Sequence, residues 1–350
     1  EGLYPEWGET DPATGKPKKV HLVGHSMGGQ TSRLLVSLLE EGDEEERRTG
    51  SCAAGSSGAA SNAGSGSRDG STGAASNAGG GRSPEERTRP VADADSTGKP
   101  GVSGLFEGGR SWVESVTTFN TPHDGTTLTS QRRNVGFIRR LFAKWLAVSS
   151  ARREEPMIDL QLDHWQTARA DGESFLEFLR RAVDEELWME IEDFSFHDLS
   201  PAGARQLNLR APASPRVYYF SWATSATAAE PETGYHVPAR GMNLPLHANA
   251  RFIGSLEELP RAAEGDPSEW WENDGIVNTC SMDGPEIGSE DRIEAFNGRP
   301  KRGLWNYMGK LFPYDHWQIH VVPPLIRTPP PGYESLLEFY RCLCDRLREL

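Results

Sequence analysis

The chain has 350 residues, a formal net charge of -14 at pH 7 and 36% hydrophobic residues, which suits one large domain or two small ones. An acidic chain binds polyanions poorly, so nucleic acid is excluded as an expected partner. The four cysteines match neither a zinc pattern nor a dense disulfide framework, no apolar run of about 18 residues predicts a membrane-spanning helix, and no signal peptide is visible.

A strand, a tight turn and a helix open the chain. Residues 18–23 (KKVHLV) have the composition of a short buried strand. In residues 28–40, leucines recur at helical spacing and form one apolar stripe. This order predicts the first unit of an α/β domain.

A low-complexity segment interrupts this domain. Residues 43–103 begin with a charged run and include a stretch made almost entirely of Gly, Ala, Ser and Asn, in which GAASNAG occurs twice. Such a composition buries too little apolar surface to offset chain entropy, and a solenoid would need more copies and a hydrophobic face. We therefore expect a disordered surface insertion between residues 1–42 and 104–350, which together form one domain.

Folded sequence resumes near residue 104 and again alternates strands with helices. Ser200 followed by Pro201 is typical of a helix start, since serine caps the first turn and proline fits the first helical position. The alternation predicts a mostly parallel sheet flanked by helices. The expected elements are strands over residues 112–119 and 217–223 and helices over residues 135–148, 175–187, 200–208 and 334–350.

A candidate nucleophile lies in the first turn. The segment GHSMG at residues 24–28 fits G-x-S-x-G between an apolar strand and an apolar helix. Such a turn lifts the Ser26 hydroxyl onto the helix N-terminus, where the Met27 backbone N–H can donate to an oxyanion. Side chains at Gly24 and Gly28 are expected to collide with neighbouring backbone. The alternatives are a glycine-rich turn with a capping serine and a phosphate loop, which would need a Lys-Ser/Thr pair.

The general base that a serine nucleophile needs is expected among nine histidines. In this type of fold the order is Ser, then Asp or Glu, then His, so the base should come late, on a loop after a strand. His316, in PYDHW, fits best, whereas His320, in the apolar run IHVV, is expected to be packed. His21, inside the first strand, and His25, beside the serine, point wrongly for the task.

The acid that orients the base should precede it on a loop after a strand. Asp274 lies in ENDGIVN, a turn-forming segment that follows two tryptophans. Asp283 and Asp315 are rivals, but Asp315 adjoins His316 and would struggle to reach the correct ring nitrogen. Without the serine and the histidine, Asp274 would be taken as an ordinary turn aspartate.

Several ordered motifs carry a family resemblance and cover nearly all the chain outside residues 41–104, among them VHLVGHSMGGQ, SVTTFNTPHDGTTL, WWENDGIVNTCSMDGP and GLWNYMGKLFPYDH. In these motifs the chain resembles the zinc- and calcium-binding thermostable bacterial triacylglycerol lipases, which are α/β-hydrolases. The resemblance implies Ser26 as nucleophile, Asp274 as orienting acid and His316 as base. It also implies that Met27 forms half of the oxyanion hole, while the residue for the other half has no match, so the N-terminal part of the domain is expected to be missing.

The resemblance also implies metal sites. The family's zinc is held by two aspartates and two histidines; one aspartate matches Asp193 and the rest have no counterpart, so a structural zinc at Asp193 is expected only in the complete protein. The family's calcium is held by two carbonyls, matching Gly241 and Pro324, and by two carboxylates, whose positions are Gln318 and Pro323 here. Loss of both acids predicts no tight calcium site.

The expected activity is hydrolysis of triacylglycerols or other carboxylic esters through an acyl-enzyme, at an oil–water interface and without a cofactor for the chemistry. Residues 135–148 fall at the family's lid, unless this helix simply packs in the core, and Trp165 and His123 are expected to be structural supports. A short-chain carboxylesterase is one alternative. An inactive hydrolase-like binding protein is another, since the first strands and half of the oxyanion hole have no match in this chain. The isolated chain is expected to be unstable, because strand 18–23 would lack partners and leave an unpaired edge. Secretion is usual in the family, while the chain itself carries no sign of its compartment.

Overall fold

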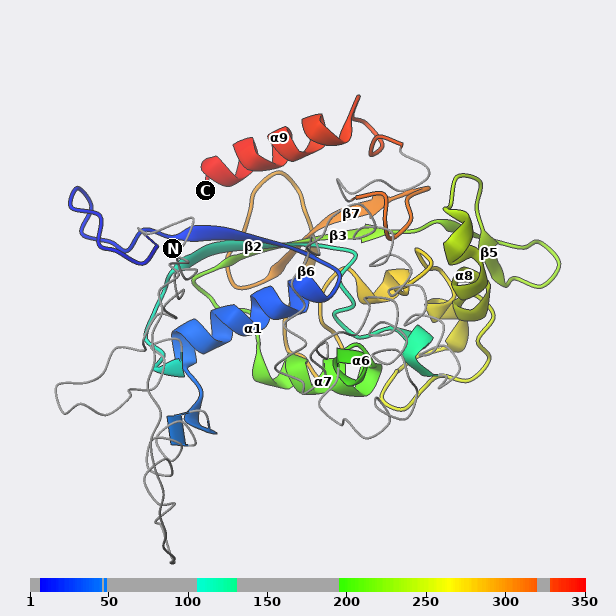
Figure 1. Cartoon of the computed structure of the whole chain (residues 1–350), viewed down its shortest axis with the longest axis horizontal. Coiled ribbons are helices and arrows are strands. Elements are labelled where there is room, and N and C mark those ends of the chain that lie inside the picture. The colour runs from blue at the N-terminus through cyan, green and yellow to red at the C-terminus, as the bar shows by residue number, and fades with distance from the viewer. Residues whose placement is uncertain (1–6, 46, 49–105, 131–194, 320–327) are drawn as a thin grey trace, which may run out of the picture. The chain divides into compact units, whose positions relative to one another are not determined.

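The computed structural model describes most of the residues that carry the predicted motifs. Within these residues, no helix is long and apolar enough to cross a membrane. The described residues are 7–45, 47–48, 106–130, 195–319 and 328–350 (Figure 1).

The chain divides into two compact units. One combines Glu1–Ser37 with Ser111–Leu350, and the other is Leu38–Arg110. The predicted insertion at 43–103 lies almost entirely outside the described residues, and the predicted helices at 135–148 and 175–187 lie wholly outside them. The insertion, the lid and the predicted domain bounds therefore stay predictions.

A five-stranded parallel sheet forms the centre of the first unit. Its strand order is β1-β2-β3-β7-β6, with parallel pairing throughout. Because all strands run the same way, their carboxyl ends meet at one edge of the sheet, where ligands bind in open α/β sheets. The strands are β1 (Val20–His25), β2 (Val113–Phe119), β3 (Tyr218–Thr224), β6 (Ile293–Ala295) and β7 (Trp305–Leu311).

The sequence predicted three of these five strands. β1, β2 and β3 correspond to the expected strands at 18–23, 112–119 and 217–223, with ends that differ by one or two residues. β6 and β7 were not predicted, because β6 has only three residues and β7 (WNYMGKL) shows no clean alternation of polar and apolar residues. A separate antiparallel pair, β4 (Thr227–Ala229) and β5 (His236–Pro238), follows β3.

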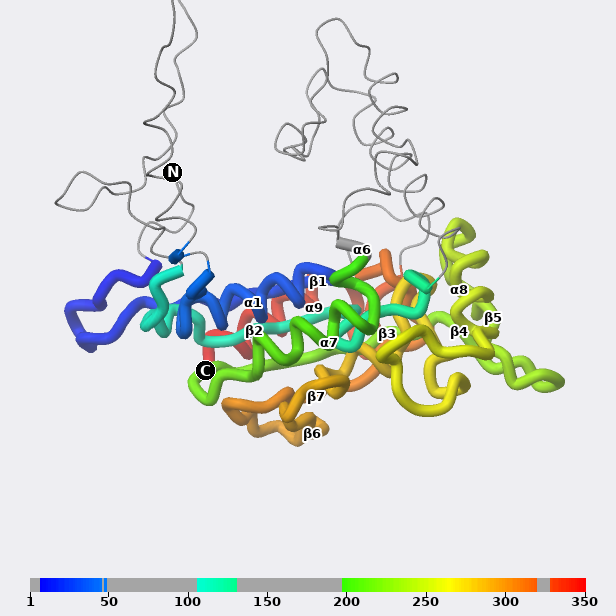
Figure 2. The backbone as a smooth tube through the Cα atoms, turned by 90° about the horizontal axis from the view of Figure 1, so that it is seen from below, coloured from blue at the N-terminus to red at the C-terminus, as the bar shows by residue number. Residues whose placement is uncertain are grey.

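Helices cover both faces of the parallel sheet, which confirms the predicted α/β-hydrolase-like fold. Helix α9 lies on one face, whereas α1 and α7 lie on the other (Figures 1 and 2). The helices are α1 (Met27–Glu41), α6 (Ser195–Asp198), α7 (Pro201–Arg210), α8 (His247–Ile253) and α9 (Leu336–Arg348), with 3-10 turns η2 (Thr127–Ser130), η4 (Leu244–Leu246), η5 (Pro267–Trp270) and η6 (Thr279–Ser281).

Helix α9 closes the largest described core cluster. Phe339, Leu343 and Leu347 recur every four residues, so they lie on one face of the helix and are buried. They pack against apolar side chains from the sheet and the loop after β7, and burial of each contributes about 1.5–3 kcal/mol. The other buried members of this cluster are Phe119, Phe220, Leu311, Tyr314 and Ile319.

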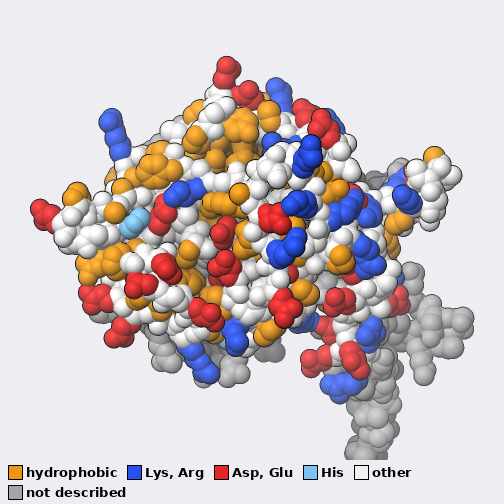
Figure 3. Space-filling view, turned by 180° about the vertical axis from the view of Figure 1, so that it is seen from behind, with side chains coloured by type: hydrophobic (Ala, Val, Ile, Leu, Met, Phe, Trp, Pro, Cys, Tyr) orange, Lys and Arg blue, Asp and Glu red, His pale blue; other side chains and the backbone are white. Residues whose placement is uncertain are grey.

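Charged side chains of both signs share one face of the molecule with apolar ones (Figure 3). Asp and Glu side chains lie among Lys and Arg side chains across the described part of this face. On this face the two signs are interspersed rather than gathered in separate patches.

The predicted helix start at Ser200 is present in α7. The Ser200 hydroxyl accepts the Gly203 N–H at 3.2 Å, and Pro201 is the first helical residue. We expect Ser200→Ala to lower the free energy of unfolding by about 1 kcal/mol, because it leaves a helical N–H without its capping acceptor. Urea unfolding followed by circular dichroism measures the change. Ser200→Asn, which preserves the cap, should match the wild type, and equal loss in both variants would contradict the capping role.

Candidate active site

Ser26 lies in the sharp turn between β1 and α1. Its φ of +55° falls in the left-handed region, which a non-glycine residue adopts only under constraint. The Ser26 N–H donates to the Phe119 carbonyl at 2.9 Å, and the Thr121 hydroxyl donates to the Ser26 carbonyl at 2.9 Å. The end of β2 and the residues after it thus hold Ser26 at the carboxyl end of β1.

Close packing against backbone at one position and against a side chain at another requires two glycines in this turn. A Cβ at Gly24 would lie 2.5 Å from backbone atoms of Gly28 and Gly29, and one at Gly29 would lie 2.2 Å from Oγ1 of Thr121. A Cβ at Gly28 would meet nothing within 4 Å, so the collision expected at Gly28 is wrong. The steric demand falls on Gly29 instead, because that residue faces the segment that follows β2.

Met27 is the first residue of α1, so its N–H has no acceptor within the helix. An oxyanion formed beside Ser26 would lie at this helix N-terminus, where free N–H groups and the helix dipole favour negative charge. Met27 is 43% exposed. The arrangement suits the oxyanion role that the sequence predicts for this N–H.

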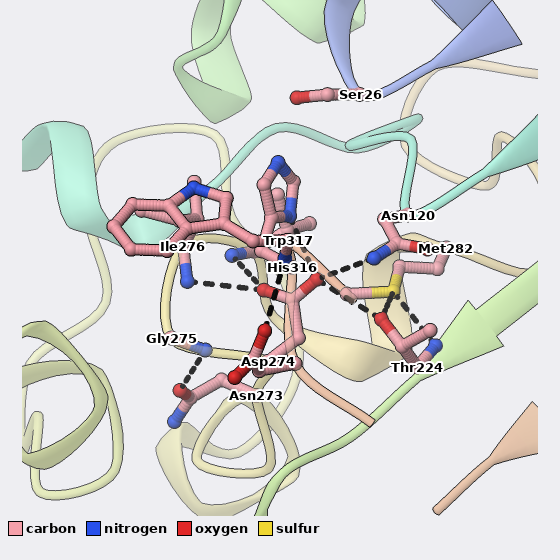
Figure 4. Close-up of polar contacts among 12 residues, drawn as sticks. Ser26, Asn120, Thr224, Asn273, Asp274, Gly275, Ile276, Met282, His316 and Trp317 are labelled. Atoms are coloured by element: carbon pink, nitrogen blue, oxygen red, sulfur yellow. Dashed lines mark hydrogen bonds and ion pairs between the residues drawn. The ribbon is translucent and has the colours of Figure 1, made fainter. Parts of the chain in front are cut away.

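The carboxylate of Asp274 is fully buried and surrounded by hydrogen-bond donors (Figure 4). Oδ1 accepts the backbone N–H groups of Ile276 at 3.0 Å and Val277 at 2.8 Å. Oδ2 accepts the Thr224 hydroxyl at 3.0 Å and the Asn120 side-chain amide at 3.2 Å. These bonds compensate the lost hydration of the carboxylate and fix the direction in which Oδ2 points.

The imidazole of His316 completes the contacts of this carboxylate. Its Nδ1 lies 2.8 Å from Oδ2 of Asp274, and the His316 backbone N–H donates to the Asp274 carbonyl at 3.0 Å. A carboxylate only accepts, so Nδ1 carries a proton, and in the neutral ring Nε2 is the nitrogen that keeps its lone pair. Figure 4 shows Nε2 on the side of the ring that faces Ser26. Among the described residues, no hydrogen bond joins the Ser26 hydroxyl to this ring, as is common before substrate binds.

His25 connects the turn of Ser26 to the loop of His316. Its Nε2 lies 3.0 Å from the His316 carbonyl oxygen, and the two ring centroids are 4.7 Å apart. His25 therefore contacts the backbone of the candidate base without occupying its place. His21 bonds Ser115 Oγ at 2.8 Å within the sheet, and His320 lies outside the described residues.

The two rival aspartates lie in other surroundings. Oδ2 of Asp315 accepts the backbone N–H and the side-chain amide of Asn243 at 2.7 and 2.8 Å, and burial raises the pKa of Asp315. Burial and the charge of Glu286 raise the pKa of Asp283 to about 7. His316 bonds Asp274 rather than either rival. Asp274 follows the 3-10 turn η5 and not a strand, which corrects the expected context of the acid.

Two residues of this arrangement escaped the sequence analysis. Asn120 and Thr224 lie at the carboxyl ends of β2 and β3, and both donate to Oδ2 of Asp274. Asn120 also has a φ of +52°. Their positions could have indicated this role, because polar residues at the carboxyl ends of adjacent parallel strands lie at the same edge of the sheet.

Two of the positions that the resemblance implies for calcium, Gly241 and Gln318, are described, and they contact each other directly. The Gly241 carbonyl faces the side-chain amide of Gln318 at 3.5 Å, and that amide also donates to Thr328 Oγ1 at 3.1 Å. Gln318 Oε1 accepts the Asp315 N–H at 2.6 Å, so the side chain links the loop of the candidate base to neighbouring segments. A neutral N–H donor occupies the place where calcium requires carboxylate oxygens.

The remaining metal positions lie outside the described residues. They are Asp193, for zinc, and Pro323 and Pro324, for calcium. Within the described part of the chain, no three His, Cys, Asp or Glu side chains are grouped to hold a metal ion. The structural zinc of the complete protein stays a prediction.

Removal of the Thr224 hydroxyl tests the support of Asp274. We expect Thr224→Val, which preserves the shape of the side chain, to lower the free energy of unfolding by about 1.5–3 kcal/mol, because a buried carboxylate loses a donor. Chemical denaturation measures the difference. Thr31→Val, at an exposed hydroxyl in α1, is the matched control and should change stability by less than about 0.5 kcal/mol. A neutral Thr224→Val would show that this bond is dispensable.

Calcium is expected to leave the protein unchanged. Calorimetric titration should show no micromolar calcium binding, and EDTA should not shift the thermal midpoint. Gln318→Ala should lower stability by about 1 kcal/mol, equally with calcium and with EDTA, because a side-chain amide and not a cation links the loops. A calcium-dependent midpoint in the wild type would overturn this interpretation.

Comparison with known proteins places these residues in a family. The family model described as "Lipase-like, C-terminal domain" matches residues 1–62 and 91–348. A protein named Lipase from Staphylococcus hyicus is 28% identical over 351 residues, covering 100% of this chain and 44% of that protein. Lipase 1 from Staphylococcus aureus (strain MRSA252) is 26% identical over 356 residues, covering 99% of this chain and 41% of that protein. The chain thus spans less than half the length of these relatives.

Solved structures agree with the family match. Lipase 1 from Pelosinus fermentans has a TM-score of 0.71 and 34% identity, covering 100% of this chain and 76% of that chain. EstA from Clostridium botulinum has a TM-score of 0.64 and 34% identity, covering 85% of this chain and 59% of that chain. These matches confirm the predicted kinship with bacterial lipases, and since the family model extends over most of the sequence, the chain belongs to the family of lipase-like C-terminal domains.

Proposed function

We propose that this protein is a carboxylic ester hydrolase that acts on triacylglycerols, with Ser26 as nucleophile, His316 as base and Asp274 as orienting acid. The observation that carries the proposal is the bond of 2.8 Å between His316 Nδ1 and Asp274 Oδ2, which directs Nε2 toward the side of Ser26 and, in the neutral ring, leaves its lone pair free to accept a proton. A strained serine beside an imidazole with a free lone pair is the arrangement that activates a hydroxyl for acyl transfer.

Each proton in the proposed reaction has a defined place. Ser26 Oγ attacks the ester carbonyl while His316 Nε2 takes the hydroxyl proton, and the carbonyl oxygen becomes an oxyanion that accepts the Met27 N–H. Collapse of this intermediate breaks the bond to the alcohol, which leaves with the proton from Nε2. Water, deprotonated by the same nitrogen, then attacks the acyl-serine, and the carboxylic acid is released as Ser26 Oγ takes back the proton from Nε2. Asp274 stabilises the imidazolium that forms in both steps.

Apolar side chains next to the reacting groups support a substrate with an acyl chain. Met27 follows Ser26 in the chain and is 43% exposed. Trp317 follows His316, and Trp317 and Ile276 both pack, partly buried, against a cluster that contains Leu246. Apolar surface of this kind favours binding of hydrocarbon over binding of a charged group. The names of the relatives, Lipase and Lipase 1, support the same substrate class.

Ser26→Ala tests the proposal. Turnover of p-nitrophenyl butyrate should fall by roughly 10⁴-fold or more, because no other group replaces the nucleophile, while the circular dichroism spectrum stays that of the wild type. Ser32→Ala, in the same helix, is the control and should remain active, since among the described contacts the Ser32 hydroxyl donates to the Gly28 carbonyl and to no reacting group. Full activity of Ser26→Ala would end the proposal.

Substrate choice separates this function from its two alternatives. Faster turnover of emulsified triolein than of soluble short esters supports a lipase, whereas the opposite order supports a short-chain carboxylesterase. A fluorophosphonate probe that labels Ser26 supports an enzyme of either kind. Absence of labelling in the complete protein would favour a hydrolase-like binding protein.

A further inference from the structure

His25 has a side-chain contact that the proposed reaction does not use. It is the last residue of β1, and its Nε2 lies 3.0 Å from the backbone oxygen of His316. A carbonyl oxygen only accepts, so His25 donates through Nε2–H. The rings of the two histidines are also packed, with centroids 4.7 Å apart and planes tilted by 60°.

We infer that His25 is a positioning residue that holds the base His316 beside the nucleophile Ser26, and this inference rests on the proposed function. The residue before the nucleophile donates to the backbone of the base. Because His25 directly precedes Ser26 in the chain, its hydrogen bond to the His316 carbonyl links the backbone of the base to the residue next to the nucleophile.

The sheet alone does not set this distance. In the strand order β1-β2-β3-β7, two strands separate the one that ends before Ser26 from the one that precedes His316. Small shifts in the spacing of each strand pair would add up across β2 and β3 and change the distance between Ser26 and His316. Asp274 orients the His316 ring through Nδ1, but Asp274 belongs to the loop after η5 and not to the turn of Ser26. Among the described contacts, the His25 bond joins the two reacting segments directly.

The turn itself has other supports, which separates a positioning role from a structural one. His25 pairs with Phe119 in the parallel register, and the Ser26 N–H donates to the Phe119 carbonyl at 2.9 Å. These are backbone contacts that survive replacement of the His25 side chain. Loss of the ring should therefore affect the alignment of the base more than the stability of the fold.

Three variants of His25 and one control test the inference. His25→Phe keeps a ring and removes the donor. His25→Gln retains an amide N–H at about the reach of Nε2, whereas the shorter amide of His25→Asn falls short of the His316 carbonyl. His21→Gln changes a histidine of the same strand whose ring bonds Ser115.

The readouts are kcat and KM for p-nitrophenyl butyrate, the rate of fluorophosphonate labelling, and the thermal midpoint. For His25→Phe we expect kcat and the labelling rate to fall by roughly ten- to hundredfold, since small misplacement of a catalytic group has effects of this size, with little change in KM or in the midpoint. His25→Gln should recover most of the loss, and His21→Gln should behave as the wild type.

The outcomes distinguish this inference from the proposed function. Wild-type kcat in His25→Phe together with an inactive Ser26→Ala would overturn the positioning role and leave the function intact. An active Ser26→Ala would overturn the function itself. If His25→Phe does not fold, the comparison of His25→Gln with His25→Asn decides, and equal rates in those two would overturn the inference.

Discussion

The buried carboxylate of Asp274 is the constraint on which the candidate site depends. An ionised carboxylate without partners would be costly in the interior, so every direction around it must be met by a donor. The donors come from the end of β2 (Asn120), the end of β3 (Thr224), the turn that contains Asp274, and His316 after β7. One side chain thereby joins three strand ends and sets the orientation of the base.

Parallel pairing explains why these residues can meet. Each strand brings the segment after it to the same edge of the sheet, so the segments that contain Ser26, Asn120 and His316 meet there although they are far apart in the chain. Pairing alone leaves the spacing across the edge loosely defined, and side-chain bonds between the loops refine it. Two sets of hydrogen bonds restrict the position of the loop that contains His316. One is the bond of His25 to the His316 carbonyl, and the other is the set made by Gln318.

The sequence predicted what depends on local patterns. The turn at Ser26 lies between an apolar strand and an apolar helix, and Ser200 before Pro201 is typical of a helix start, so the sequence predicted both the turn and the start of α7. The steric role of Gly29 was missed because it depends on the approach of Thr121 after β2, a contact between distant segments. The role of Thr224 was missed, and His25 was set aside, for the same reason. Their partners, Asp274 and the His316 carbonyl, become evident only when the strand order is known.

Backbone strain is concentrated where the reacting groups lie. Among the described non-glycine residues, positive φ occurs at Ser26, Asn120 and Ala262, and the first two directly follow adjacent strands. Asparagine tolerates the left-handed region better than serine, because its short polar side chain can bond locally, yet the Asn120 amide is committed to Asp274 and its Oδ1 is buried without a described partner. Each such residue costs about 1–3 kcal/mol, which the surrounding pairing must offset. The strain at Asn120 is therefore best explained by the donor it presents to Asp274, as the strain at Ser26 is by the hydroxyl it presents to substrate.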